Sequence, residues 1–316
     1  MIPYTQILEE LQKRHCRKAA IQLPEGLKRF SPEISATLKK SGIDTIITGD
    51  PCWGACDLAL DAKEEVDCIV HIGHTPVTRD EGVIYIPYRK YINADVLKTV
   101  AEKLKKYESV SITTTIQHAQ QTETFAEELK KLGVNAVVGK GSERTPEPGQ
   151  ILGCTYAAAK NAQTAANLFI GSGVFHAIGV SLATGKPTFA LDPYADGILQ
   201  EVNADKLLRK RFVQIEKAKH AKNFGILLSS KSGQKRKELA ERLATLHENA
   251  FVILIREITE IQLRNLGFDA YVNTACPRLA LDDQVRFPVP LLSPAEFEIV
   301  LGLRDWDDYE IDEIIQ

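Results

Sequence analysis

Three of the six cysteines lie in loop-like stretches, where they could bind a metal cluster. Cys56 closes the run Gly-Asp-Pro-Cys-Trp-Gly-Ala-Cys, Cys154 follows Leu-Gly, and Cys276 precedes Pro-Arg. Free cysteine is usually buried in apolar elements, so a position among glycines and prolines needs another explanation. Three thiolates suit an iron–sulfur cluster with one iron left open, since full ligation takes four. A metal site with one open position can accept a substrate there.

The other three cysteines are weaker candidates. Cys16 lies in a polar segment and Cys68 begins an apolar run, so we interpret both as structural. Cys52 precedes Cys56 by the first spacing of the radical S-adenosylmethionine motif Cys-x3-Cys-x2-Cys, but Ala59 occupies the third position. We therefore interpret Cys52 as a neighbour of the cluster, and whether it contributes to the cluster stays open.

A zinc site is the competing interpretation of the same residues. It would use His71, His74 or His118 beside the cysteines. A zinc ribbon is not expected, because the chain has no pair of Cys-x2-Cys motifs. Disulfides are not expected in a reducing compartment.

The sequence predicts that alternating strands and helices position these residues. Such alternation predicts crossover units and parallel sheets, that is, an α/β protein. Parallel strands are buried on both faces, which explains the continuous apolar runs. The predicted strands are 18–23, 43–48, 68–72, 83–86, 109–115, 134–138, 167–171, 187–191, 224–229, 250–254 and 270–274, and the predicted helices are 32–40, 120–132, 175–184, 234–246 and 260–266.

A weak internal repeat indicates three related domains. Three times, near residues 20, 111 and 224, a strand leads through a polar turn into an amphipathic helix and then into another strand. The period is too long for a solenoid and suits three fused parallel-sheet domains around a pseudo-threefold axis. We predict domains at 1–105 with Cys56, 106–215 with Cys154, and 216–316 with Cys276 and an acidic tail. Ligands of such sheets bind at the carboxyl ends of the strands, where the cysteines could converge.

Composition excludes several classes of protein. The 316 residues are 44% hydrophobic and 26% charged, which is typical of a soluble globular protein. The net charge of −3 argues against nucleic acid as a partner. We expect neither a membrane span nor a signal peptide, and so a cytoplasmic protein. Two charged segments, 206–222 with seven Lys or Arg and 305–316 with six Asp or Glu, are interpreted as solvated surface.

A set of short motifs carries a family resemblance over residues 20–290. In order they are Gln-Leu-Pro-Glu-Gly-Leu from 22, Gly-Ala-Cys-Asp from 54, Thr-Ile-Gln-His from 115, Leu-Gly-Cys from 152, Ile-Gly-Ser-Gly from 170 with His176, Leu-Asp-Pro-Tyr from 191, Ser-Gly-Gln from 232, and Asn-Thr-Ala-Cys-Pro-Arg from 273 with Asp282 and Asp283. Together they resemble the archaeal diphthamide synthase family, 2-(3-amino-3-carboxypropyl)histidine synthase. Each motif alone is weak, but their order together with the three loop cysteines is specific.

The resemblance implies a homodimer with one 4Fe-4S cluster per chain, held by Cys56, Cys154 and Cys276. It implies a non-standard radical reaction that cleaves the Cγ–S bond of S-adenosylmethionine. The 3-amino-3-carboxypropyl group is added to a histidine of translation elongation factor 2, the first step of diphthamide biosynthesis. An electron donor of unknown identity is also implied.

Several turns at strand ends are candidates for binding S-adenosylmethionine. A cationic side chain and backbone amides at a helix start could hold its carboxylate, which nominates Lys231, Ser232, Gly233 and Gln234. The corresponding turns of the other domains contribute Glu25 and Gly26, and Gln117 and His118. The adenosine could approach Gly171, Ser172 and Gly173, and Asp192 is either a ligand or a turn cap. Each has a plain alternative as an ordinary turn or structural residue, and Arg278 and Asp282 could simply pair on a helix.

Two other functions stay open. Quinolinate synthase also has three related α/β domains and a three-cysteine 4Fe-4S cluster with an open iron, but it acts as a dehydratase. A non-catalytic partner subunit of the same family is the second alternative. The presence of all three loop cysteines argues against a non-catalytic role.

Overall fold

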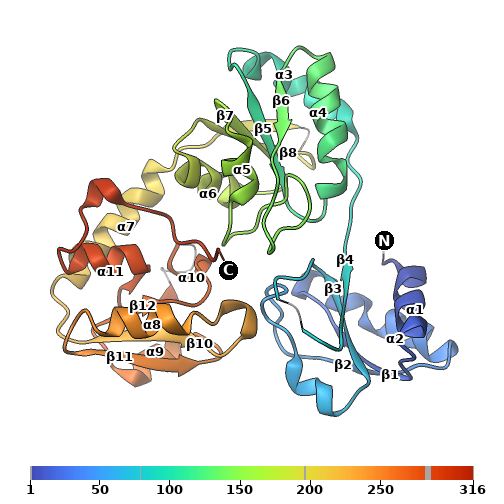
Figure 1. Cartoon of the computed structure of the whole chain (residues 1–316), viewed down its shortest axis with the longest axis horizontal. Helices are drawn as coiled ribbons and strands as arrows, with labels where there is room; N and C mark the ends of the chain where they lie inside the picture. The colour runs from blue at the N-terminus through green and yellow to red at the C-terminus, as the bar shows by residue number, and fades with distance from the viewer. Residues whose placement is uncertain (1, 79, 196, 282–285, 316) are drawn as a thin grey trace.

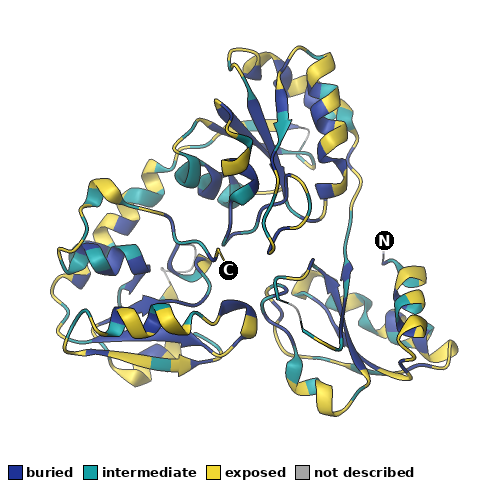
Figure 2. Ribbon diagram, viewed as in Figure 1, coloured by how far each residue is buried: buried dark blue, intermediate teal, exposed yellow. Residues whose placement is uncertain are grey.

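The computed structural model describes residues 2–78, 80–195, 197–281 and 286–315. Within these ranges the chain forms three α/β units, each a sheet with its packed helices, which lie at the corners of a triangle (Figure 1). The central strands are buried, and the outer faces of the helices are exposed (Figure 2). The predicted fold class, three related α/β domains with parallel-dominated sheets, is confirmed.

The first unit contains a parallel sheet of order β2-β1-β3-β4. Its apolar helix faces cover the sheet, with Ile7, Leu11, Ile34 and Leu38 buried against the strands. Its elements are β1 (Lys18–Gln22), β2 (Asp44–Ile47), β3 (Cys68–Gly73) and β4 (Val83–Pro87), with α1 (Tyr4–Lys13) and α2 (Ser31–Lys40).

The second unit repeats this order and adds an antiparallel edge, giving β6-β5-β7-β8-β9. Its strands are β5 (Val110–Thr114), β6 (Ala136–Val138), β7 (Ala166–Ile170), β8 (Thr188–Asp192) and β9 (Ile198–Glu201). Its helices are α3 (Lys98–Leu104), α4 (Thr122–Lys131), α5 (Ala157–Ala162) and α6 (Phe175–Thr184).

The third unit has the parallel order β11-β10-β12-β13. Its strands are β10 (Phe224–Ser229), β11 (Ala250–Ile255), β12 (Ala270–Asn273) and β13 (Leu291–Leu292). Its helices are α7 (Asp205–Ala218), α8 (Lys237–Ala244), α9 (Glu260–Leu266), α10 (Arg278–Leu281) and α11 (Pro294–Val300). Each of the three sheets thus begins with the same strand order, as the internal repeat predicted.

The eleven predicted strands and five predicted helices are all present, with ends shifted by a few residues. The sequence interpretation missed β9, β13 and several helices, including α1, α3 and α7. Strand β13 spans two residues, too short for any periodic signal. Helix α7 has a polar composition that hides its narrow buried stripe of Arg211, Ile215 and Ala218.

The predicted domain limits at 105 and 215 stay predictions, and helix packing suggests where to refine them. Helix α3 buries Val100, Ala101 and Leu104 in the core of the second unit. Helix α7 buries Ile215 and Ala218 in the core of the third unit. We therefore propose that the second domain begins before α3 and that the third includes the end of α7.

The two charged segments are not simply solvated surface, which corrects the sequence interpretation. Arg211 of α7 is 1% exposed and forms a two-pronged ion pair with Glu296, at 2.7 and 2.6 Å. In the acidic tail, Ile311 and Ile314 are buried, and Asp312 and Glu313 are each 9% exposed. Periodicity does not reveal such pairs, because their partners lie far away in the sequence. Among the described residues, no helix has the length and apolar character needed to cross a membrane.

Candidate functional site

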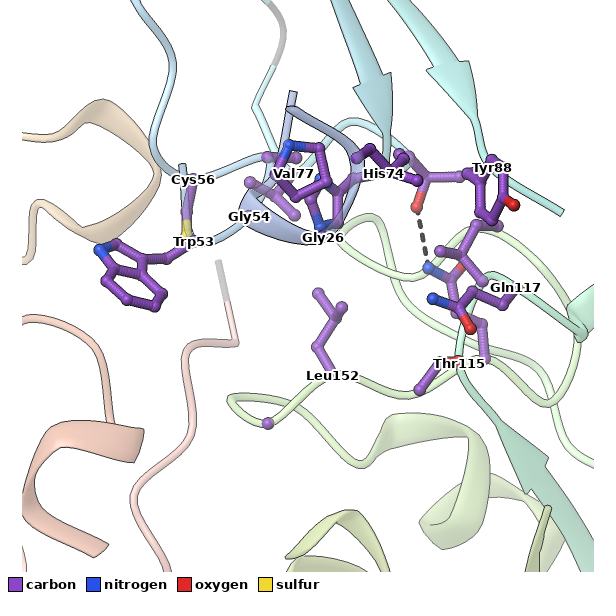
Figure 3. A pocket seen from close by; sticks show the side chains of 18 of the residues that line it. Gly26, Trp53, Gly54, Cys56, His74, Val77, Tyr88, Thr115, Gln117 and Leu152 are labelled. Carbon is purple, nitrogen blue, oxygen red and sulfur yellow. Dashed lines mark hydrogen bonds between the residues drawn. The ribbon is translucent and has the colours of Figure 1, made fainter. Parts of the chain in front are cut away.

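A cavity of about 510 Å³ lies where the three units meet. Its wall includes Cys56 from the first unit, Cys154 from the second and Cys276 from the third. Figure 3 shows Cys56 and Trp53 at one end, Tyr88, Thr115 and Gln117 at the other, and Leu152 reaching between them. The three loop cysteines therefore converge, as the repeat had suggested.

Cys56 lies in the loop that follows β2 and faces the third unit. Its Sγ accepts a hydrogen bond from Gln234 Nε2 at 3.2 Å. Gly233 packs so closely that an added Cβ would lie 2.5 Å from the Cα of Cys56. Burial raises the pKa of the Cys56 thiol, and the bond from Gln234 opposes that rise.

Cys154 and Cys276 lie in tight loops of the other two units. The Cys154 loop is closed by a bridge between Leu152 and Thr155, and the carbonyl of Cys276 accepts from Asn273 Nδ2 at 2.7 Å. Burial raises the pKa of Cys154 to about 11 and that of Cys276 to about 12. Negative charge on Cys56 raises both values further, because the three thiols face one another.

Cationic side chains compensate charge on these sulfurs. The Arg144 guanidinium lowers the pKa of Cys154 against the effect of burial, and it also donates to the Gly233 carbonyl at 2.9 Å. Arg278 stacks on Phe175 with its guanidinium carbon 4.5 Å from the ring centroid. A thiolate set with nearby guanidinium groups is suited to a negatively charged cluster.

The donor set fits a cluster better than a single ion. Within the described ranges, no group of three His, Cys, Asp or Glu side chains is close enough to hold one metal ion. In a cubane cluster each thiolate binds its own iron, so the sulfurs need not meet at one point. The three histidines of the zinc alternative are also separated: His71 contacts His74 at 2.9 Å, whereas His118 contacts Lys90 and Tyr194.

The remaining cysteines are placed differently. Cys52 is 2% exposed, and its Sγ lies 3.8 Å from the Gly54 carbonyl. It is not among the described residues that line the cavity, and burial raises its pKa to about 12. Cys16 and Cys68 are buried together in the core of the first unit. The burial of Cys16 and Cys68 agrees with their structural interpretation, and whether Cys52 contributes to the cluster stays open.

Two of the predicted substrate-binding residues line the cavity, and two more support it from behind. Gly26 and Gln117 are part of the wall. Gly233 and Gln234 are buried against Cys56 without lining the cavity, so their contact is with the cysteine. The polar turn of the third unit thus contacts Cys56, and its contact with a substrate carboxylate stays a prediction.

Other predicted residues have partners outside the cavity wall that the structure describes. Lys231 is 5% exposed, and its Nζ pairs with Asp57 at 3.0 Å and Glu257 at 2.7 Å. Glu25 pairs with Lys28 at 2.7 Å. Lys231 thus pairs with two carboxylates of the protein, and its role toward the substrate stays a prediction.

The other predicted residues are not among the described residues that line the cavity. His118 bridges the Lys90 carbonyl at 3.0 Å and the Tyr194 hydroxyl at 3.1 Å, and Asp192 caps a turn by accepting from the Tyr194 amide at 2.9 Å. These contacts are compatible with a structural role for His118 and a turn-capping role for Asp192, the alternatives that the sequence left open beside substrate binding. The others lie outside the described lining, namely Gly171, Ser172, Gly173 and Ser232. Asp282, the suggested partner of Arg278, lies outside the described residues.

Several polar residues of the wall were not among the predicted substrate-binding residues. Arg144, Lys90 and Arg29 add positive charge, and His74 and His176 add imidazoles. Burial lowers the pKa of both imidazoles to about 4, so they are neutral at pH 7. Arg144 lies in a loop rich in glycine and proline ahead of Cys154, and this loop composition was the one feature of the sequence that could have indicated a place at the site.

Comparisons with known proteins agree with this geometry. The family described as "Putative diphthamide synthesis protein" matches residues 23–311. A 2-(3-amino-3-carboxypropyl)histidine synthase of Pyrococcus horikoshii is 36% identical, over 99% of this chain and 94% of that protein. Subunit 1 of the same synthase from Schizosaccharomyces pombe is 29% identical, over 94% of this chain and 73% of that protein.

A solved structure is similar over the whole chain. The crystal structure of Dph2 from Pyrococcus horikoshii with a 4Fe-4S cluster matches with a TM-score of 0.94 and 37% identity. The match covers 100% of this chain and 94% of that one. The shared fold, the family match and the close relative lead to one assignment: the chain belongs to the diphthamide synthesis protein family.

Proposed function

We propose that this protein is a 2-(3-amino-3-carboxypropyl)histidine synthase, an iron–sulfur-dependent transferase. It would transfer the 3-amino-3-carboxypropyl group of S-adenosylmethionine to a histidine of translation elongation factor 2, the first step of diphthamide biosynthesis. The observation that carries the proposal is the meeting of Cys56, Cys154 and Cys276, one from each unit, at one cavity. The similar structure that holds a 4Fe-4S cluster supports it.

In this proposal the three cysteines hold one 4Fe-4S cluster per chain. Three thiolates leave one iron of the cluster without a protein ligand, which is the position available to a substrate. The bound cluster would supply the electron that cleaves the Cγ–S bond of S-adenosylmethionine, in a non-standard radical reaction. The residues of this chain set where the substrate lies, and that position determines which of the three carbon–sulfur bonds faces the open iron.

The wall of the cavity offers groups for each part of S-adenosylmethionine. A volume of about 510 Å³ is in the range of small-molecule sites. Arg144 and Arg278 lie near the cysteines and can hold the methionyl carboxylate close to the cluster. Aromatic side chains of the wall, including Trp53 and Tyr88, offer surface to the adenine.

The net reaction balances without an external oxidant. S-adenosylmethionine loses its 3-amino-3-carboxypropyl group and leaves as methylthioadenosine. Carbon C2 of the target imidazole gains the group and releases its proton to solvent. The modified imidazole would return to the oxidised cluster the one electron that cleavage consumed, so the donor of unknown identity would be needed only to prime the cluster.

We propose a homodimer on the basis of an exposed apolar surface. Strand β11 is an edge of its sheet and exposes Phe251 (53%) and Leu254 (67%), and helix α9 exposes Ile261 (72%) and Leu266 (43%). Phe251 is on the face of the sheet that α9 covers and Leu254 is on the opposite face, so the exposed apolar residues flank both sides of an unpaired strand edge, which is typical of association surfaces. Leu254→Glu should convert the dimer to a monomer in sedimentation analysis, and an unchanged mass would contradict this surface.

We further propose that the enzyme acts in the cytoplasm, where its protein substrate is found.

One anaerobic experiment tests the proposed function. The protein is reconstituted with iron and sulfide, assayed for both, and incubated with dithionite and S-adenosylmethionine. We expect a brown protein with about four irons per chain and methylthioadenosine as the nucleoside product. Predominant 5′-deoxyadenosine would contradict the cleavage mechanism, quinolinate formation from its precursors would favour the dehydratase, and a colourless protein would favour a non-catalytic subunit.

A further inference from the structure

The C-terminal segment, residues 311–315, packs between the second and third units. In Figure 1 this last part of the chain, in red, reaches the centre of the triangle. Ile311 and Ile314 are 8% and 5% exposed, and Ile311 packs in a cluster with Ile151, Tyr156 and Leu281. A terminus that is this well buried has a cost in chain entropy, which packing must offset.

The segment is tied directly to the loop that carries Cys154. The amide of Ile314 donates to the carbonyl of Cys154 at 2.7 Å. The carboxylate of Glu313 accepts from the amide of Tyr156 at 3.0 Å and pairs with Lys160. Two neighbouring positions of the tail therefore hold the backbone on both sides of Thr155.

Arg236 connects the same segment to the loop that carries Cys276. Its guanidinium forms a two-pronged ion pair with Asp312, with both N–O distances at 2.7 Å. It also donates to the carbonyls of Thr274 at 2.8 Å and Ala275 at 3.1 Å, directly before Cys276. Arg236 stands two positions after Gln234, whose side chain holds the sulfur of Cys56.

We propose that the C-terminal segment, acting through Arg236, is a clamp that positions the cysteine loops around the cavity. Its acidic side chains neutralise one cation from each of two units, Lys160 and Arg236, and its backbone fixes Cys154. The side chains of Arg236, Asp312 and Glu313 are only 9–13% exposed, where a two-pronged charged pair is strong and geometrically specific. These are positioning residues, since they act through the cysteine loops.

The primary test is hydrogen–deuterium exchange of the apoprotein, which needs no cluster. The variants are Asp312→Asn, Arg236→Lys and a truncation after Glu310, with Asp307→Asn as the matched control because Asp307 is an exposed acid of the same tail. We expect amide exchange in residues 150–158 and 274–279 to accelerate by at least about tenfold in the first three variants, with β1 unchanged. The control should exchange like the wild type.

Two results would overturn the clamp. Unchanged exchange in the truncated protein would show that the cysteine loops need no tail, and equal acceleration across all three units would show a general loss of stability. A second readout, iron and sulfide bound after reconstitution, rests on the proposed function, and we expect less than half of the wild-type content in the truncated protein. If the loops loosen but the wild type itself takes up no iron, the clamp stands and the proposed function fails.

Discussion

Gln234 donates a hydrogen bond to the sulfur of Cys56 over 3.2 Å, although 178 positions separate the two residues in the chain. The bond crosses from the third unit to the first. It brings an amide donor to a thiol whose pKa burial raises, and it favours the thiolate form. The contact that joins the third unit to the first therefore also lowers the pKa of the Cys56 thiol against the effect of burial.

Removing this donor should change the electronic properties of the bound cluster. Hydrogen bonds to cluster sulfurs raise the reduction potential, so Gln234→Met should lower the midpoint potential and slow reductive cleavage. Potentiometric titration followed by electron paramagnetic resonance measures the shift. Gln150→Met is the matched control, because Gln150 lines the same cavity but donates to Thr75 Oγ1 at 2.8 Å. An equal shift in both variants would contradict a specific effect of the bond on Cys56.

A methyl group at position 233 should displace Cys56. The added Cβ would lie 2.5 Å from the Cys56 Cα and 2.7 Å from its Cβ, and backbone cannot yield as a flexible side chain does. We expect Gly233→Ala to lose about 1–3 kcal/mol of unfolding free energy and most of its iron uptake. Gly49→Ala is the control, since nothing lies within 4 Å of its added Cβ. Normal iron uptake in Gly233→Ala would show that the Cys56 position tolerates the shift.

Single cysteine replacements should separate ligands from neighbours. Cys56→Ala, Cys154→Ala and Cys276→Ala should each remove or cripple the cluster, because each sulfur lies at the cavity. Cys52→Ala and Cys68→Ala should keep it and lose only packing energy. The visible absorbance of the anaerobically reconstituted proteins measures this. Bleaching by Cys52→Ala with retention in Cys56→Ala would reverse the assignment.

Lys231 should prove to be structurally required. Lys231→Met leaves Asp57 in a buried site without its cation, and loss of one partner of such a pair costs about 3–5 kcal/mol. Urea unfolding of the apoprotein measures this cost, with the exposed Lys235→Met as control. The double variant Asp57→Asn/Lys231→Met should recover part of the loss. A change of less than about 0.5 kcal/mol in Lys231→Met would mean that the pair contributes little.

Acidification should destabilise the apoprotein through buried histidines. Burial lowers the pKa of His71 to about 3 and that of His74 to about 4, from an ordinary value of 6.5. Between pH 6.5 and 4 the unfolded chain binds protons that the folded chain does not. The unfolding free energy should therefore fall by about 1.4 kcal/mol per pH unit for each such histidine.

Urea unfolding at pH 7.5, 6 and 5 measures this slope. His71→Gln should flatten it by about one histidine's share, because glutamine does not titrate and can still contact Gln22. The exposed His220→Gln is the control and should keep the wild-type slope. A His71→Gln slope equal to that of the wild type would mean that His71 is already protonated in the folded protein.

Most strands and several helix ends could be predicted from the local sequence pattern. Runs such as 68–72 and 224–229 are apolar because parallel central strands are covered on both faces. Gly42, Gly133 and Gly267 follow helix ends and have φ values of 79°, 84° and 71°, which glycine adopts at little cost. The three loop cysteines could be identified from local sequence too, because burial in the core does not explain a thiol among glycines and prolines.

The tertiary structure decided what each polar side chain does. The sequence could nominate Lys231 for a substrate, but only the packed chain brings Asp57 and Glu257 to it. The acidic composition of the tail from 305 predicts a solvated segment, but in the folded chain its carboxylates pair with Arg236 and Lys160. Strand and helix periodicity follows from neighbours along the chain, whereas charge pairing and the meeting of three sulfurs depend on contacts between residues tens to hundreds of positions apart. The amino-acid sequence by itself therefore determined the elements and the candidate cysteines, and the assembly of three sheets around one cavity determined their partners.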